Sequence, residues 1–229
     1  MNILAIDPGS TSTKIGVFRQ GNTVKASIEH PRQEIEGFAA VMDQFAYRLD
    51  CIDAYLAAQG LADLPFHAVV GRGGLIRPVE GGVYLVDDLL ARDLTQGVSG
   101  EHAANLGGLL ARALAERHGA PAYVVDPPVL DELWPVARLS GLAGIERKSM
   151  FHALNQKAAA RDVARELGRP YESLSLIVVH MGGGITAGAH RLGRVVDVNN
   201  GLNGDGPFAP GRVPPSSSPR AATPISPSS

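Results

Sequence analysis

The chain has 229 residues, of which 45% are hydrophobic and 5% aromatic, and its formal net charge is −2. This size and composition predict one large or two modest globular domains. The nearly balanced, scattered charges exclude the strongly basic surfaces that bind nucleic acid or anionic membranes, and no apolar run reaches the ~20 residues of a membrane span. The single cysteine, Cys51, and an N-terminus that starts directly with a strand pattern favour a cytoplasmic location.

The first predicted elements are two strands joined by a polar loop. Residues 3–6 (ILAI) and 15–18 (IGVF) are apolar runs typical of buried strands, and the loop sequence DPGSTSTK lies between them. In residues 34–60, apolar side chains recur at alternating spacings of three and four, which predicts one helix ended by Gly60. A coiled coil would give the same spacing.

The rest of the chain alternates between strand and helix patterns. Short strands are expected within 66–74, at the start of 81–94 and within 121–129, and helices in the second part of 81–94 and in 100–119. A long helix at about 149–167 precedes a strongly buried strand at 174–184. This alternation predicts an α/β fold with a mixed or parallel sheet.

Residues 3–27 are similar in pattern to residues 176–199. An offset of 172 places Gly16 on Gly188 and Gly21 on Gly193, whereas Gly9 meets Gly182 at an offset of 173, so the second loop is one residue shorter. Two interpretations stay open, namely a chance similarity of hairpins and a duplicated domain whose halves each begin with the same β-meander. In the second case the second half looks unfinished. Residues 210–229 contain six prolines and six serines and are predicted to be disordered.

The loop that follows the first strand carries many groups that can bind an anion. Its glycine, Gly9, lets backbone amides approach closely, and hydroxyl donors follow it. Asp7 can hold a hydrated Mg²⁺ beside phosphates, and Lys14 follows the loop. The candidate nucleotide-binding residues of this loop are Gly9, Ser10, Thr11, Ser12, Thr13 and Lys14. An ordinary turn is the alternative, because the pattern is not a P-loop.

A second glycine loop, HMGGG, occupies the equivalent place in the other half. Two such loops that face each other would clamp the phosphate chain of a nucleotide. The candidate residues of the second loop are His180, Gly182, Gly183 and Gly184.

Several motifs together resemble the butyrate kinases of the acetokinase family, within the superfamily of actin, sugar kinases and heat-shock-chaperone ATPases. The motifs are IDPGSTSTKIGVF, GRGG, VVDPPVLDE, RKSMFHALNQKAAAR and HMGGGITAGAHRLGRVVDVNNGLNGDGPF. The resemblance implies duplicated, ribonuclease-H-like α/β domains of the actin and acetokinase type, the second incomplete. It divides the chain into an N-terminal domain (1–145), the start of a nucleotide-side domain (146–209) and a disordered tail (210–229). The family pattern is lost after Phe208, and our interpretation is a truncation or frameshift.

The resemblance also implies transfer of the γ-phosphoryl group of ATP, with Mg²⁺, to the carboxylate of butyrate or a related short or branched fatty acid. Because a carboxylate is already a nucleophile, such a site has to bring two anions together and stabilise charge on the transferred group. The implied partners are ATP and a short-chain carboxylic acid, with no nucleic acid and no membrane, and a homo-oligomer is left open. A non-catalytic fragment and an ATP-gated binding protein are the alternative functions.

Four residues receive catalytic roles from the resemblance. Arg72 is similar to the arginine that binds the substrate carboxylate, and His152 to the histidine that donates to the transferring phosphoryl group. Asp126 is similar to an aspartate that organises the site or its metal, and Arg212 aligns with a second arginine. The plain structural alternatives are a solvated loop arginine for Arg72, a core histidine for His152 and a helix N-cap for Asp126.

Overall fold

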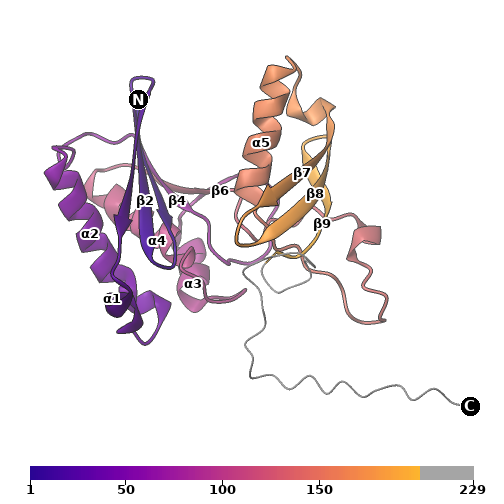
Figure 1. Ribbon diagram of the computed structural model, residues 1–229, viewed down its shortest axis with the longest axis horizontal. Coiled ribbons are helices and arrows are strands. Elements are labelled where there is room, and N and C mark those ends of the chain that lie inside the picture. The colour runs from indigo at the N-terminus through magenta and orange to yellow at the C-terminus, as the bar shows by residue number, and fades with distance from the viewer. Residues whose placement is uncertain (202–229) are drawn as a thin grey trace, which may run out of the picture.

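The computed structural model describes residues 1–201, which form two lobes (Figure 1). The predicted tail at 210–229 and Arg212 lie outside the described residues. The elements of the first lobe are β1 (Asn2–Pro8), β2 (Ser12–Arg19), β3 (Asn22–Glu29), α1 (Arg32–Glu36), the 3₁₀ helix η1 (Val41–Asp43), α2 (Gln44–Ala58), β4 (Ala68–Arg72), β5 (Val83–Leu85), α3 (Asp88–Gln96), α4 (Asn105–Arg117) and β6 (Ala122–Val125).

The first lobe is built on one mixed sheet of six strands in the order β3-β2-β1-β4-β6-β5. Strands β1, β4 and β6 run parallel to one another, while β2, β3 and β5 are antiparallel to their neighbours. The mixed α/β sheet expected from the alternation of patterns is therefore present. Parallel order requires a crossover between neighbouring strands, and the helices α2 and α4 lie in these connections.

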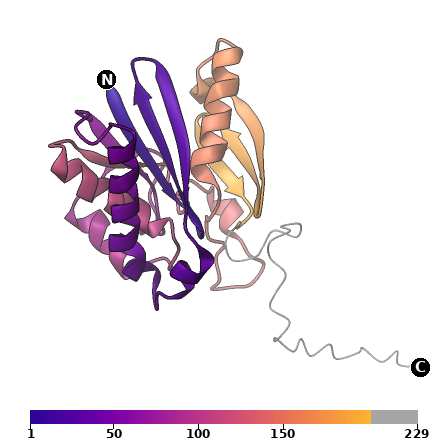
Figure 2. The same cartoon turned by 60° about the vertical axis from the view of Figure 1, so that its left-hand side comes forward.

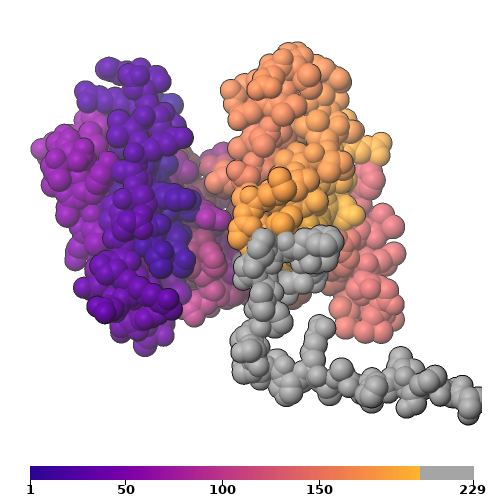
Figure 3. All heavy atoms as spheres, viewed as in Figure 1, coloured from indigo at the N-terminus to yellow at the C-terminus, as the bar shows by residue number. Residues whose placement is uncertain are grey.

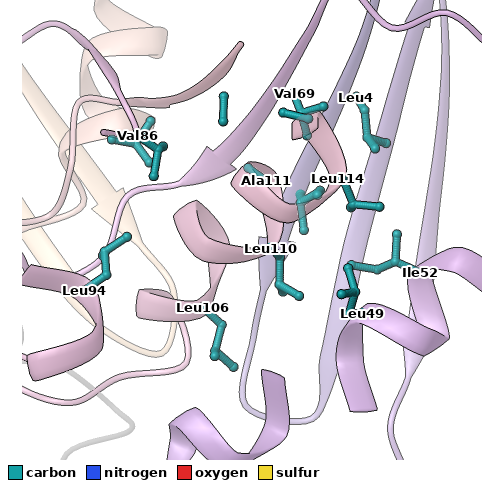
Figure 4. Packing of buried hydrophobic residues seen from close by; sticks show 14 of the residues in the cluster. Leu4, Leu49, Ile52, Val69, Val86, Leu94, Leu106, Leu110, Ala111 and Leu114 are labelled. Atoms are coloured by element: carbon teal, nitrogen blue, oxygen red, sulfur yellow. The ribbon is translucent and has the colours of Figure 1, made fainter. Parts of the chain in front are cut away.

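The core of this lobe lies between the sheet and the helices on one of its faces. Alternate residues of β1 and β2, such as Leu4 and Ile15, are fully buried and meet Leu49 of α2 and Leu110 of α4. Figure 4 shows Leu4, Leu49 and Leu110 converging from the sheet and from both helices. Figure 2 shows the same helices on one side of the sheet and the second lobe on the other.

Helix α4 packs unusually close to strand β4, because glycines face each other at the contact. A Cβ atom on Gly71 would lie 2.1 Å from the backbone oxygen of Gly107, and one on Gly107 would lie 2.4 Å from the backbone oxygen of Arg72. Only glycine permits this distance. The contact fixes the end of β4, where Arg72 is the last residue.

The second lobe is a three-stranded antiparallel sheet, β7-β8-β9, covered on one face by a helix. The segment between β6 and this helix has little regular structure, but its Leu130 and Leu133 pack against Phe151 and Val195. The elements after β6 are η2 (Pro135–Arg138), α5 (Ala153–Glu166), η3 (Tyr171–Ser173), β7 (Ser175–Met181), β8 (Ile185–Arg191) and β9 (Arg194–Val198). The division of the chain after residue 145 stays a prediction.

The two meanders predicted from the internal repeat are both present and match in backbone detail. The β2–β3 turn has φ of 49° at Gln20 and 82° at Gly21, and the β8–β9 turn has 51° at Leu192 and 81° at Gly193, at the expected offset of 172. Two consecutive positive φ angles are typical of a type I′ hairpin turn. The β1–β2 loop leaves four residues between the last paired residues, Pro8 and Thr13, and the β7–β8 loop leaves three, as the change of offset predicts.

Two sequence predictions about secondary structure are wrong. The helix expected over 34–60 is divided, because Ala40 is extended and the chain restarts as η1 and α2, where the Asp43 carboxylate accepts from the Ala40 N–H. The strand expected to be strongly buried at 174–184 is only partly buried, and on one face alone. Its outward side chains, Ile177 and Met181, are more than two-thirds exposed, because α5 packs against the opposite face. Within residues 1–201, no helix is both long and apolar enough to cross a bilayer.

Candidate active site

Three of the predicted site residues lie at the carboxyl ends of neighbouring parallel strands. Asp7 is near the end of β1, Arg72 ends β4, and Asp126 directly follows β6. Because these strands are adjacent in the order β1-β4-β6, their ends meet at one edge of the sheet. Ligands of α/β sheets bind outside this edge, so the topology itself places a candidate site here.

Arg72 and Asp7 form an ion pair. The Arg72 Nη1 donates to the Asp7 Oδ1 at 3.1 Å, and both side chains are partly exposed. Among the described residues the other N–H groups of this guanidinium have no acceptor, so they are available to bind an anion. Lys14 lies across the hairpin from Asp7, and both residues line a cavity together with Arg72. Strand alternation alone would also allow the Lys14 side chain to point into solvent.

Asp126 is buried and connects the two lobes. Its Oδ1 accepts from the Gly82 N–H at 2.9 Å, and its Oδ2 accepts from Arg161 of α5 at 2.8 Å. Its backbone has φ of 41°, an uncommon value for a residue other than glycine, although aspartate tolerates it better than most. The helix N-cap interpretation is wrong, because the residues after Asp126 form a turn and an irregular segment.

Two histidines of the second lobe stack on each other. The His152 and His180 rings lie 3.8 Å apart between centroids, with 14° between their planes. The His180 Nδ1 pairs with the Asn155 Oδ1 at 2.8 Å. Burial and then the positive charge of Arg72 lower the pKa of His180. Arg72 of the first lobe and both histidines of the second line one cavity.

A buried chain of hydrogen bonds assigns the proton of His152. The Gln156 Nε2 donates to both the backbone oxygen and the Oγ1 of Thr186, and a carbonyl can only accept, so the amide orientation is fixed. The Thr186 hydroxyl, itself fully buried, then donates to the His152 Nδ1 at 3.0 Å. With Nδ1 as the acceptor in this network, a neutral His152 carries its proton on Nε2.

The site residues surround a cavity of about 440 Å³ between the lobes, which Figure 3 shows as a hollow between the two masses. Its charged and polar lining comprises Asp7, Lys14, Arg72, Asp126, His152, Asn155 and His180. A smaller hollow of about 230 Å³ adjoins it, shares Arg72 and His152, and is lined by Gly183 and Gly184. A Cβ on Gly184 would lie 3.0 Å from the His152 ring, so this glycine makes room for the histidine.

The remaining loop candidates do not line either hollow. Ser10 and Thr11 are exposed at the tip of the β1–β2 loop. Thr13 has a role other than the predicted one, because its hydroxyl is fully buried and bonded to His30 and Arg48, and is not available to a phosphate. The candidates that lie outside both linings are Gly9, Ser10, Thr11, Ser12, Thr13 and Gly182.

Sequence reasoning missed several residues of the site. His102 lines the smaller hollow, and Arg161 holds Asp126. Asn155 lies one turn after His152 on α5, and this spacing within the HALNQ sequence was the one available signal. The others have no local signature, because they reach the site from distant parts of the chain.

The carboxylates of the site, Asp7 and Asp126, are too few to hold a magnesium ion by themselves. They suit an ion that is also bound by the phosphates of a nucleotide. In residues 1–201 there is no group of three or more His, Cys, Asp or Glu side chains that could hold a metal. Asp7 is partly exposed, and Mg²⁺ is commonly bound by one or two carboxylates together with water and phosphate oxygens. Both oxygens of Asp126 already accept hydrogen bonds, from Gly82 and Arg161, whereas among the described residues Asp7 uses only its Oδ1, with Arg72, so the Oδ2 of Asp7 is the available ligand atom.

Comparison with solved structures finds the same fold in three kinases. An acetate kinase from Porphyromonas gingivalis superimposes with a TM-score of 0.64 at 16% identity, over 87% of this chain and 57% of that protein. An acetate kinase from Entamoeba histolytica gives 0.61 at 16% identity, over 88% and 55%. A propionate kinase from Francisella tularensis gives 0.59 at 15% identity, over 88% and 57%. The fold is that of the acetate and propionate kinases.

The likeness extends over most of this chain but over little more than half of those enzymes. No protein-family model matches the sequence. The three kinases are named for acetate and propionate, so the butyrate preference implied by the sequence motifs stays a prediction.

Proposed function

We propose that the chain is a carboxylate kinase that transfers the γ-phosphoryl group of ATP to butyrate or a related short or branched fatty acid. The observation that supports this most is the meeting of Arg72, Lys14 and two stacked histidines in one cavity, on a fold similar to that of acetate kinases. The need for ATP agrees with the predicted cytoplasmic location.

The residues of the cavity meet the two requirements of the reaction. Arg72 has free N–H groups that suit a planar carboxylate, and Lys14 adds a second positive charge, so an anionic acid can be held beside anionic phosphates. His152, with its proton on Nε2, donates to charge that develops on the transferred group, and it needs no protonation to do so. A bound Mg²⁺ would neutralise further phosphate charge, with Asp7 as its protein ligand.

An assay for acyl phosphate tests the proposal. The protein is incubated with Mg-ATP and acetate, propionate, butyrate or isobutyrate, and the product is trapped as a hydroxamate. Arg72→Met should lower kcat/KM by about 10²–10³-fold, the usual effect of removing one donor to developing charge. Arg32→Met, an exposed arginine paired with Glu36 on α1, should have no effect.

The alternative functions give different results in the same experiment. ATP binding without product from any acid would support an ATP-gated binding protein. Neither binding nor product would support a non-catalytic fragment. Either outcome would contradict the proposed kinase.

A further inference from the structure

Directly behind the β1–β2 loop lies a fully buried arginine that the proposed reaction does not use. Arg48 of α2 has no exposed surface. Its five N–H groups make five hydrogen bonds of 2.9–3.2 Å, and every acceptor is neutral. The acceptors are the backbone oxygens of Ser10 and Ser12, the Oγ1 of Thr13 and, twice, the Oε1 of Gln44.

The charge of Arg48 is not balanced by an anion. Within residues 1–201, no carboxylate forms an ion pair with it. His30, which is hydrogen-bonded to Thr13, has its pKa lowered by burial and by Arg48, which favours its neutral form, and a neutral ring supplies no countercharge. A buried charge is costly without a partner, and hydrogen bonds satisfy its donors but leave its field intact.

The field of Arg48 passes through the peptide groups of the loop. In a trans peptide the N–H points away from the carbonyl, so a guanidinium bonded to the Ser10 oxygen faces one end of the dipole and the Thr11 N–H lies at the other. The Ser10 and Thr11 N–H groups have no acceptor in the described part of the chain, and both residues are exposed. The loop therefore offers two free N–H donors, and the one at Thr11 lies on the side of its peptide group away from the buried cation.

We propose that Arg48 is a positioning residue whose unbalanced charge makes the β1–β2 loop a binding site for polyphosphate. The incoming anion supplies the countercharge that the protein lacks, and the five hydrogen bonds hold the loop in shape before it arrives. The inference rests on the proposed function, since it identifies how that function's nucleotide phosphates are held.

The test adds a negative charge beside Arg48 without removing any of its hydrogen bonds. In Gln44→Glu the new carboxylate keeps an acceptor at the position that receives two bonds from Arg48, and it cancels the net charge. The probe is inorganic tripolyphosphate with Mg²⁺, measured by calorimetry, because it needs no adenine site. We expect binding to weaken by about 10-fold, the Coulomb effect of one unit charge on a multiply charged anion about 10 Å away. The melting temperature should stay the same or rise.

Gln59→Glu, at the opposite end of α2, is the matched control, because it changes the net charge equally but leaves Arg48 untouched. It should bind tripolyphosphate as the unaltered protein does. Equal binding by the Gln44→Glu variant would overturn the role of Arg48 and leave the kinase proposal standing. Failure of the unaltered protein to bind tripolyphosphate would overturn the loop as a phosphate site. Normal tripolyphosphate binding without acyl phosphate formation would contradict only the kinase.

Discussion

Acidification should destabilise this protein through His190, which is 2% exposed on β8. Its Nε2 donates to the Gln156 Oε1 at 3.0 Å, and its Nδ1 accepts from the Tyr171 hydroxyl at 2.7 Å, so the neutral ring is fully hydrogen-bonded. Burial, and then the charge of Lys157, lower the pKa of His190 from 6.5 to about 4. A proton on this ring therefore favours the unfolded chain.

The magnitude follows from linkage. The folded protein keeps His190 neutral, whereas the unfolded chain takes up a proton near pH 6.5. The neutral His190 ring therefore contributes fully to the free energy of unfolding above pH 6.5. This contribution decreases as the pH falls and stops decreasing below the folded pKa of about 4. The difference between the two pKa values corresponds to a loss of about 3 kcal/mol in the free energy of unfolding.

Urea denaturation from pH 8 to pH 4 would measure this loss, with His190→Gln as the comparison. Gln can accept from Tyr171 and donate to Gln156, but it does not titrate. The difference between the two proteins at pH 8 gives the packing cost of the substitution. When the free energy of unfolding of each protein is plotted against pH, the two curves should converge by about 3 kcal/mol below pH 6.5. Parallel curves, or a His190 ring that titrates near 6.5 by NMR, would refute the reasoning.

Three further perturbations test the packing and charge of the site. Lys157→Met leaves the buried Glu132 carboxylate without its cation and should cost about 3–5 kcal/mol in urea denaturation. Gly107→Ala places a methyl group against the backbone of β4 and should lower stability by about 1–3 kcal/mol, with a lower melting temperature. Arg72→Met removes a positive charge near His180 and should raise the pKa of that histidine, as NMR titration would record.

Each of these has its own control. Combining Lys157→Met with Glu132→Gln should recover part of the lost stability, because no charge is left buried alone, and no recovery would show that the ion pair is not the cause. Gly82→Ala should be nearly neutral, since its Cβ would meet ordinary contacts of 3.6 Å or more. An unchanged pKa of His180 would mean that the lobes stand further apart in solution than in the structure.

The local elements were predictable because their signals are local. The short apolar runs predicted β1 and β2, and the repeated glycines predicted both meanders, down to the turn at Gly21 and its counterpart at Gly193. The candidates Arg72 and Asp126 could be placed at strand ends from the same patterns. Backbone torsions and side-chain periodicity depend mainly on neighbouring residues, so short sequence patterns predict most of these elements.

Tertiary structure decided which groups meet and which surfaces are covered. The Ile177 side chain belongs to an apolar strand, yet it is 74% exposed, because burial depends on what packs against a face and not on the strand itself. Likewise, the sequence predicts Thr13 as a hydrogen-bond donor to phosphate, but in the structure its hydroxyl accepts a hydrogen bond from Arg48, which is 35 residues away. Hydrogen bonds between distant residues form only when the whole fold brings them within about 3 Å, and no short pattern encodes that distance.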